Sequence, residues 1–215
     1  MYPYARRLGD ADAEAVWKRL LALPDSPAKK AAMVKVIAAM PFGAAEKTAL
    51  ANPDLFASKI ALCAHLATVA VKAGMPEAAV RLAKEIHAEP VADPQKADPR
   101  QTPLKSILVS LAYADFPAAK SLYGDVADVY GADAPYTFLP TFLEAAQRSR
   151  NRQAFDAELA DARRLPDPGR RFDVLMTAAR CLRAGGAPAA GDALLDELEK
   201  AADTGETSLA ELSYI

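Results

Sequence analysis

The sequence has little of what metal sites, disulfide frameworks and nucleic-acid binding require. It contains two cysteines, Cys63 and Cys181, and two histidines, His65 and His87. Both cysteines lie in apolar helical stretches, where they are predicted to pack as small core residues, although a disulfide between them stays open. The formal net charge is −2, whereas proteins that wrap nucleic acid carry a basic excess. We therefore expect no metal, no cofactor and no nucleic-acid partner.

Long apolar runs are also missing. The first ten residues have no apolar core of the kind that a signal peptide carries. The longest stretch of low charge, residues 60–71, is too short to cross a bilayer. The sequence predicts a soluble, cytoplasmic protein without a membrane span, unless the chain is a fragment whose targeting signal lies upstream of Met1.

Strand signals are nearly absent, and helix signals fill their place. Alanine is abundant throughout, and most prolines and glycines fall between segments with helical apolar spacing. Residues 89–101 hold three prolines and are predicted to form an irregular surface loop. Helices are predicted at 11–23, 27–40, 43–51, 53–73, 76–88, 102–114, 117–130, 135–149, 151–164, 169–184 and 188–202.

The ends of these predicted helices carry capping residues. Ser26, Asn52 and Asp167 each precede a proline, which is typical of an N-cap followed by proline at the first helical position. Glycines stand where a left-handed C-cap is expected, at Gly74, Gly131, Gly185 and Gly186.

A helix, a short turn and a second helix recur along the chain. The four copies are segments 66–86, 108–123, 142–155 and 174–195. Their predicted turn residues are Gly74, Asp115, Ser149 and Gly186, which are 41, 34 and 37 residues apart. A period of this size describes stacked helical hairpins, in which each hairpin buries the apolar face of its neighbour. The segment 11–23 is similar to the second helix of such a unit, so the chain begins halfway through a repeat.

The clearest copy resembles the tetratricopeptide-like helical repeats. The positions that carry the resemblance are Leu66, Ala67, Ala70, Gly74, Ala79, Ala83 and Ile86, and the likeness extends over residues 53–200. It implies a divergent member of that superfamily: an all-α, right-handed α-solenoid of antiparallel helix pairs, with residues 1–215 forming a single repeat domain. It also implies an extended groove that suits a peptide or a helix of a partner protein.

Motifs of catalysis are missing. The sequence has no glycine-rich phosphate loop, no His-Glu-x-x-His and no Gly-x-Ser-x-Gly. Cys63 and His65 are two positions apart, so on a helix their side chains diverge and do not form a chelating pair. His65 is predicted to be a core or groove-lining residue, and His87 to complement a helix C-terminus. We expect no catalytic, cofactor or metal site, and hence no enzyme.

If the tetratricopeptide-like geometry holds, the first helix of each pair lines the concave surface. The partner-binding residues that this implies are Lys72, Lys105, Tyr113, Tyr136, Leu139, Leu143, Met176, Arg180 and Arg183. A second basic segment, residues 148–152, is explained by a solvated face or, alternatively, by a site for an acidic peptide or a carboxylate.

Taken together, these features predict a non-catalytic scaffold or adaptor that binds a protein or peptide partner. The alternatives are a regulatory or docking domain of a larger enzyme or assembly and, less favoured by the charge, an RNA-binding helical repeat. Homodimerisation is a further alternative, because a terminal repeat exposes an apolar face. The tail 202–215 either covers such a face or hangs free.

Overall fold

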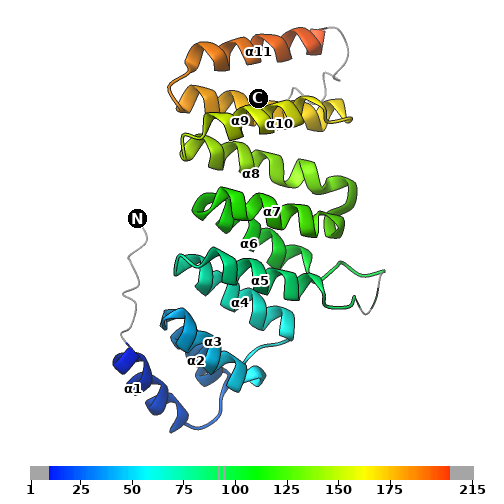
Figure 1. The fold of residues 1–215 in the computed structure, drawn as a ribbon. Helices are drawn as coiled ribbons and strands as arrows, with labels where there is room; N and C mark the ends of the chain where they lie inside the picture. Colours follow the sequence, from blue (N-terminus) through cyan, green and yellow to red (C-terminus); the bar gives the residue numbers. More distant parts are fainter. Residues whose placement is uncertain (1–9, 92, 94, 204–215) are drawn as a thin grey trace. The chain divides into compact units, whose positions relative to one another are not determined.

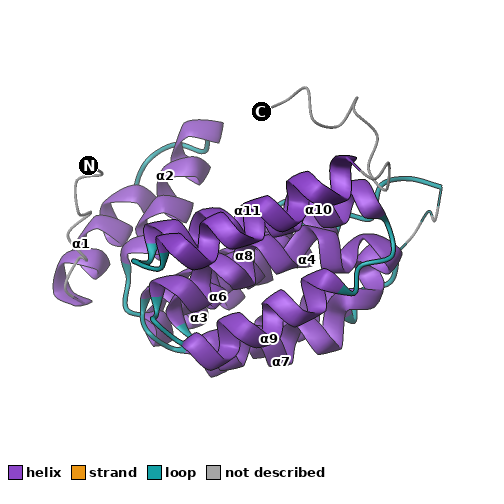
Figure 2. Cartoon of the chain, turned by 90° about the horizontal axis from the view of Figure 1, so that it is seen from above, coloured by secondary structure: helices purple, strands orange, loops and turns teal. Residues whose placement is uncertain are grey.

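The computed structural model describes residues 10–91, 93 and 95–203 of the chain. These residues form helices joined by turns and loops, and they contain no strand (Figure 2). The all-α prediction is therefore confirmed. The chain divides into two compact units, residues 1–129 (unit 1) and 130–215 (unit 2). The single repeat domain over 1–215 stays a prediction.

Unit 1 is built from sequential helix pairs arranged in two layers. Helices α4 and α5 pack against each other, as do α6 and α7, and in addition α4 contacts α6 while α5 contacts α7 (Figure 1). The first helices of these pairs therefore form one layer and the second helices another. Its helices are α1 (Asp10–Leu21), α2 (Pro27–Ala39), α3 (Phe42–Ala51), the 3-10 helix η1 (Pro53–Leu55), α4 (Lys59–Lys72), α5 (Pro76–His87), α6 (Gln101–Ala114) and α7 (Phe116–Val126).

Alanine allows the close approach of these helices. Ala67 and Ala70 of α4, and Ala79 and Ala83 of α5, are completely buried. A side chain of one carbon keeps the two backbones near each other, and larger residues fill the spaces between the pairs. The largest fully buried side chains of unit 1 are Ile37, Leu66, Ile86, Leu104, Ile107, Leu108, Leu111 and Leu122.

Unit 2 follows the same local plan. The 3-10 segment η2 (Ala127–Asp133) leads into α8 (Ala134–Arg148), α9 (Arg152–Arg163), α10 (Pro168–Ala184) and α11 (Pro188–Asp203). Helix α8 packs on α9, α10 packs on α11, and α8 also contacts α10. The core of this unit contains three fully buried aromatic side chains, Phe138, Phe142 and Phe155.

Several predicted caps are confirmed. The Ser26 side chain accepts a hydrogen bond from the Lys29 backbone N–H at 3.1 Å, and Asp167 accepts one from the Arg170 N–H at 3.0 Å. Gly74 and Gly186 have positive φ angles of 71° and 85°, as left-handed C-caps require. Caps of this kind can be predicted from the sequence because each involves only residues that are close together along the chain.

Two predicted helices have different boundaries. The helix predicted over 53–73 is divided: η1 ends at Leu55, Phe56 is extended, and α4 begins only after Ser58, whose side chain accepts from the Ala61 N–H at 3.1 Å. The helix predicted over 117–130 ends at Val126 and gives way to η2, which is broken at Gly131 (φ 56°). In the first case the sequence carries two helix starts, at Pro53 and after Ser58, and α4 uses the second.

The turn between α8 and α9 also differs from its prediction. The residue with a left-handed backbone is Arg150 (φ 56°), not the predicted Ser149. The backbone N–H of Asn151 bonds to the Ala146 carbonyl, just as Met75 bonds to Ala70 in the α4–α5 turn. Arg150 therefore occupies the position that Gly74 occupies there. Asp115 makes a different turn, since it is extended and caps α7 by accepting from Ala118 N.

The remaining sequence predictions on this level concern proline, cysteine and membranes. Pro140 lies inside α8, so not every proline falls between helices. Cys63 and Cys181 are both buried, which confirms them as core residues, and they do not form a disulfide with each other. In the part of the chain that the structure describes, no helix combines the length and apolarity that a membrane span requires.

Candidate functional site

The first helices of unit 1 carry positive charge and no negative charge. We name α2, α4 and α6 the first-helix layer; α4 contacts both α2 and α6. These three helices contain six lysines and no aspartate or glutamate. The net charge of the whole chain is −2, so the cationic character is a local property of this layer.

The second helices of unit 1 differ because their charges pair with one another. Arg81 of α5 forms ion pairs with Glu46 of α3 and with Glu85. Lys84 of α5 lies 3.0 Å from Asp125 of α7. These contacts tie α3, α5 and α7 together and neutralise the face that they share. The charges of the second helices are thus largely used within the fold.

Three lysines of the first-helix layer are exposed on three different helices. Lys72 of α4 and Lys105 of α6 are exposed, as is Lys35 of α2. Tyr113, on the same helix as Lys105, exposes 42% of its surface. Of the predicted partner-binding residues in unit 1, all three therefore lie on the exposed part of this layer. The same two helices, α4 and α6, also carry short side chains that are exposed or half-buried, namely Thr68, Ser106, Val109 and Ser110.

The predicted residues of unit 2 fall into two groups. Arg180 and Arg183 of α10 are exposed, and Met176 is half-buried. Leu139 and Leu143 of α8 are only 5% and 0% exposed. The structure contradicts their placement on a binding surface, because both side chains are part of the core of unit 2.

Tyr136, the remaining predicted residue, is engaged inside unit 2. Its hydroxyl accepts a hydrogen bond from the Asp167 backbone N–H at 3.1 Å. The Arg170 guanidinium lies 3.7 Å from the centre of its ring, and the same arginine pairs with Asp133 at 2.6 Å. Tyr136 therefore helps to hold the start of α10 against α8.

His65 is a half-buried residue of α4, as predicted for a core or groove-lining position. Its ring lies 5.4 Å from the ring of Phe56, centre to centre, and its Nε2 atom is buried without a hydrogen-bond partner among the described residues. Burial lowers the pKa of His65 below its ordinary value of 6.5, and the charge of Lys72 lowers it further. A backbone hydrogen bond with Val34 acts in the opposite direction on the pKa. A proton on Nε2 would nevertheless be buried without an acceptor among the described residues.

This arrangement predicts a specific dependence of stability on pH. Because the pKa of His65 is lower in the folded chain, the unfolded chain binds more protons below about pH 6.5. The free energy of unfolding should be highest above that pH and fall as the pH decreases toward the lowered folded pKa. His65→Gln should reduce the change of the urea midpoint with pH between about pH 5 and 7.5. This window lies above the titration of carboxylates. An unchanged slope in the variant would rule out His65 as the cause.

His87 ends α5, as the sequence predicted, and it has a partner that the sequence did not identify. Its Nε2 lies 2.9 Å from an oxygen of Asp128. The backbone carbonyl of His87 accepts a hydrogen bond from Arg100 at 2.7 Å, and Arg100 also pairs with Asp98. These contacts attach the loop that precedes α6 to the end of α5, so this cluster is explained by loop anchoring.

Neither thiol is activated. Burial and the nearby Glu85 raise the pKa of Cys63 to about 11, and burial and Glu144 do the same for Cys181. Both are protonated at neutral pH and are poor nucleophiles. Within the described ranges, no three His, Cys, Asp or Glu side chains are grouped so that they could hold a metal ion.

One acidic residue lies in the interior of unit 2. The side chain of Glu158 is only 3% exposed. It lies on the inner stripe of α9 together with Phe155 and Ala162. The period of a helix brings residues three and four apart to one face, so a carboxylate at this spacing enters the interior with its apolar neighbours.

Comparison of the chain with protein-family models, with curated proteins and with solved structures found no match.

Proposed function

We propose that the chain is a non-catalytic interaction scaffold that binds an acidic segment of a partner protein along the first-helix layer of unit 1. One observation carries the proposal: α2, α4 and α6 hold six lysines and no acidic residue. Lys29 and Lys59 pair with Asp25 and Glu89, which lie outside these helices. A surface whose helices contribute cations and no acidic residue attracts an acidic partner and increases its rate of association.

The shape and chemistry of the layer support a polypeptide ligand. Tyr113 offers an exposed aromatic ring next to a row of short side chains, and tyrosine is enriched among the residues that contribute most to protein interfaces. Lys72 and Lys105 are exposed on the two neighbouring helices α4 and α6. A helix with acidic residues on one side and apolar residues on the other is the complementary ligand.

We infer further that the helix pairs follow the α-solenoid plan that the repeats predict. In such a plan each pair is stabilised by its neighbours, and one face of the first helices stays open to a ligand. The docking domain of a larger enzyme or assembly would use the same surface in the same way. The scaffold and the docking-domain hypotheses therefore predict the same ligand for the layer. They differ only in whether the chain works as part of a larger enzyme or assembly.

The test compares two double variants with equal changes of charge. Lys72→Glu/Lys105→Glu reverses the charge at two exposed positions of the layer, and Lys47→Glu/Lys200→Glu makes the same change at exposed positions elsewhere. Each chain is immobilised and exposed to nuclease-treated extract and to an array of acidic 15-residue peptides. Retained peptides should lose about tenfold in affinity with the first variant and little with the second.

Two outcomes would contradict the proposal. Equal losses with both double variants would show that only the net charge of the chain matters. Retention of single-stranded RNA in place of peptides, abolished by the first variant alone, would assign the layer to the RNA-binding alternative.

A further inference from the structure

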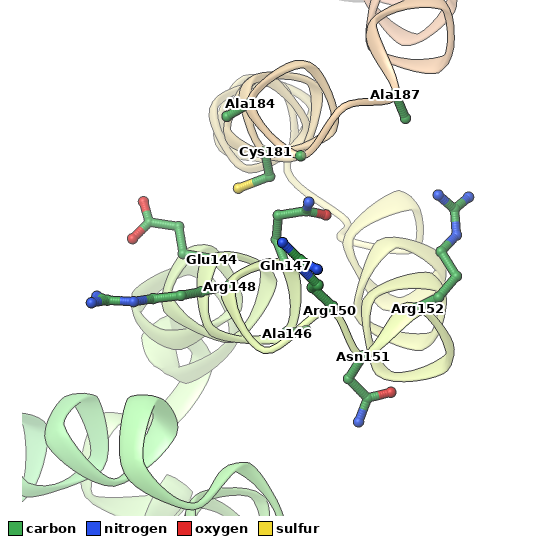
Figure 3. A pocket seen from close by; sticks show the side chains of 11 residues that line it. Glu144, Ala146, Gln147, Arg148, Arg150, Asn151, Arg152, Cys181, Ala184 and Ala187 are labelled. Carbon is green, nitrogen blue, oxygen red and sulfur yellow. The ribbon is translucent and has the colours of Figure 1, made fainter.

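Unit 2 contains a cavity of about 640 Å³ beside the turns that join α8 to α9 and α10 to α11. Figure 3 shows it between the end of α8, the start of α9 and the end of α10. Its volume lies in the range of roughly 300–1,000 Å³ that is typical of pockets for small ligands. This cavity contains none of the residues of the first-helix layer, so what it binds is independent of the function proposed above.

Three arginines line this cavity. Arg148 ends α8, Arg150 lies in the turn and Arg152 begins α9. Glu144 is the one acidic residue of the lining, so the side chains around the cavity carry two net positive charges. Arg152 is already paired with Asp156 at 2.9 Å. The Arg150 backbone N–H donates to the Gln147 carbonyl at 3.0 Å. The guanidinium of Arg150 forms no hydrogen bond or ion pair with the residues that the structure describes.

Arg150 has a backbone conformation that is unusual for arginine. Its φ of 56° is one that glycine adopts freely and that a residue with a Cβ adopts at an energetic cost. The equivalent turns of the α4–α5 and α10–α11 pairs use Gly74 and Gly186. An arginine therefore stands where the fold favours glycine, and its guanidinium borders the cavity. A residue that keeps a strained backbone conformation beside a cavity is a candidate for a functional role.

The rest of the lining completes a polar site with one apolar wall. The Gln147 amide faces the cavity and packs so closely on Gly185 that a Cβ there would come within 1.4 Å of its Nε2 atom. Cys181 and Ala184 of α10 form the apolar side. Glycine at 185 thus leaves room for the amide, which adds a donor and an acceptor next to the guanidinium groups.

We propose that this cavity binds a small molecule with more than one negative charge on oxygen, through the guanidinium of Arg150 supported by Arg148, Arg152 and the amide of Gln147. Guanidinium groups bind phosphate and carboxylate oxygens through two parallel hydrogen bonds, which favours such a ligand over a halide. Phosphate and carboxylate groups share this chemistry, so both classes are candidates.

The experiment measures binding of pyrophosphate and of citrate to the full chain by titration calorimetry, with sodium chloride of equal ionic strength as the reference. Arg150→Gly removes the guanidinium from a position that suits glycine, so this variant should be at least as stable as the parent chain. Arg180→Gln removes one exposed charge from α10 outside the cavity and is the matched control. The anion that binds more tightly identifies the ligand class.

We expect Arg150→Gly to weaken binding about tenfold or more and Arg180→Gln to leave it nearly unchanged. No binding of either anion above the chloride reference would overturn the proposal. So would equal weakening by both variants, because that result would come from the general charge of the unit.

Discussion

Leu143→Ala should destabilise unit 2 by about 3 kcal/mol, within a range of 2–5 kcal/mol. The side chain is completely buried in α8, next to Phe142, which is 1% exposed. Its removal loses the transfer free energy of the buried methyl groups and leaves a cavity that the packed helices only partly fill. The measurement is urea unfolding followed by circular dichroism, together with hydrogen exchange of α8 and α10.

The matched control is Leu50→Ala on α3. Leu50 exposes 61% of its surface, so the same truncation there should change stability by no more than about 0.5 kcal/mol. The pair of variants separates a core residue from a surface residue of identical chemistry. If the two leucines gave equal midpoints, Leu143 would not be a core residue, and its assignment to a binding surface would be restored.

Gly191→Ala should also destabilise unit 2, by about 1–3 kcal/mol. A Cβ at this position of α11 would lie 2.9 Å from the carbonyl oxygen of Ala179 and 2.5 Å from Cγ of Arg183, both on α10. The carbonyl oxygen belongs to a helix backbone and cannot rotate away, so the two helices must separate. This cost exceeds the gain of about 1 kcal/mol that alanine brings to a helix interior.

Gly124→Ala on α7 provides the comparison. A Cβ there would meet nothing within 4 Å. The substitution should therefore stabilise the chain by up to about 1 kcal/mol, since only the helix propensity changes. Opposite signs for the two glycines, read from thermal or urea unfolding, are the expected result. A stabilising Gly191→Ala would show that α10 and α11 do not pack as closely as the structure has them.

The helices and their caps could be predicted because their causes are local. The side chains of Ser26 and Asp167 accept hydrogen bonds from backbone N–H groups three residues away. Gly74 and Gly186 adopt the left-handed conformation that ends a helix. The start of α4 was harder, because Pro53 and Ser58 both offer a helix start. Each signal is sound by itself. In the structure Phe56 is extended between the two starts, and its ring lies 5.4 Å from the ring of His65 on α4.

The candidate surfaces were less predictable than the helices. Leu143 and Lys72 were both placed on an exposed face, yet one is completely buried and the other is exposed. A helix presents the same apolar spacing whether its stripe meets a neighbour or a ligand. The burial of Glu158 and the cavity position of Arg150 were missed for a related reason, since both depend on elements distant in sequence.

The sequence by itself determined that this chain is helical, where most helices begin and end, and that successive helices pair across short turns. Those properties follow from hydrogen bonds and side-chain spacing within a few residues. The tertiary structure alone decided which stripe of each helix is covered, that the acid-free helices α2, α4 and α6 share a layer, and that arginines of one turn surround a cavity. Burial and surface charge depend on which helices become neighbours, and a helical period is the same for every choice of neighbour.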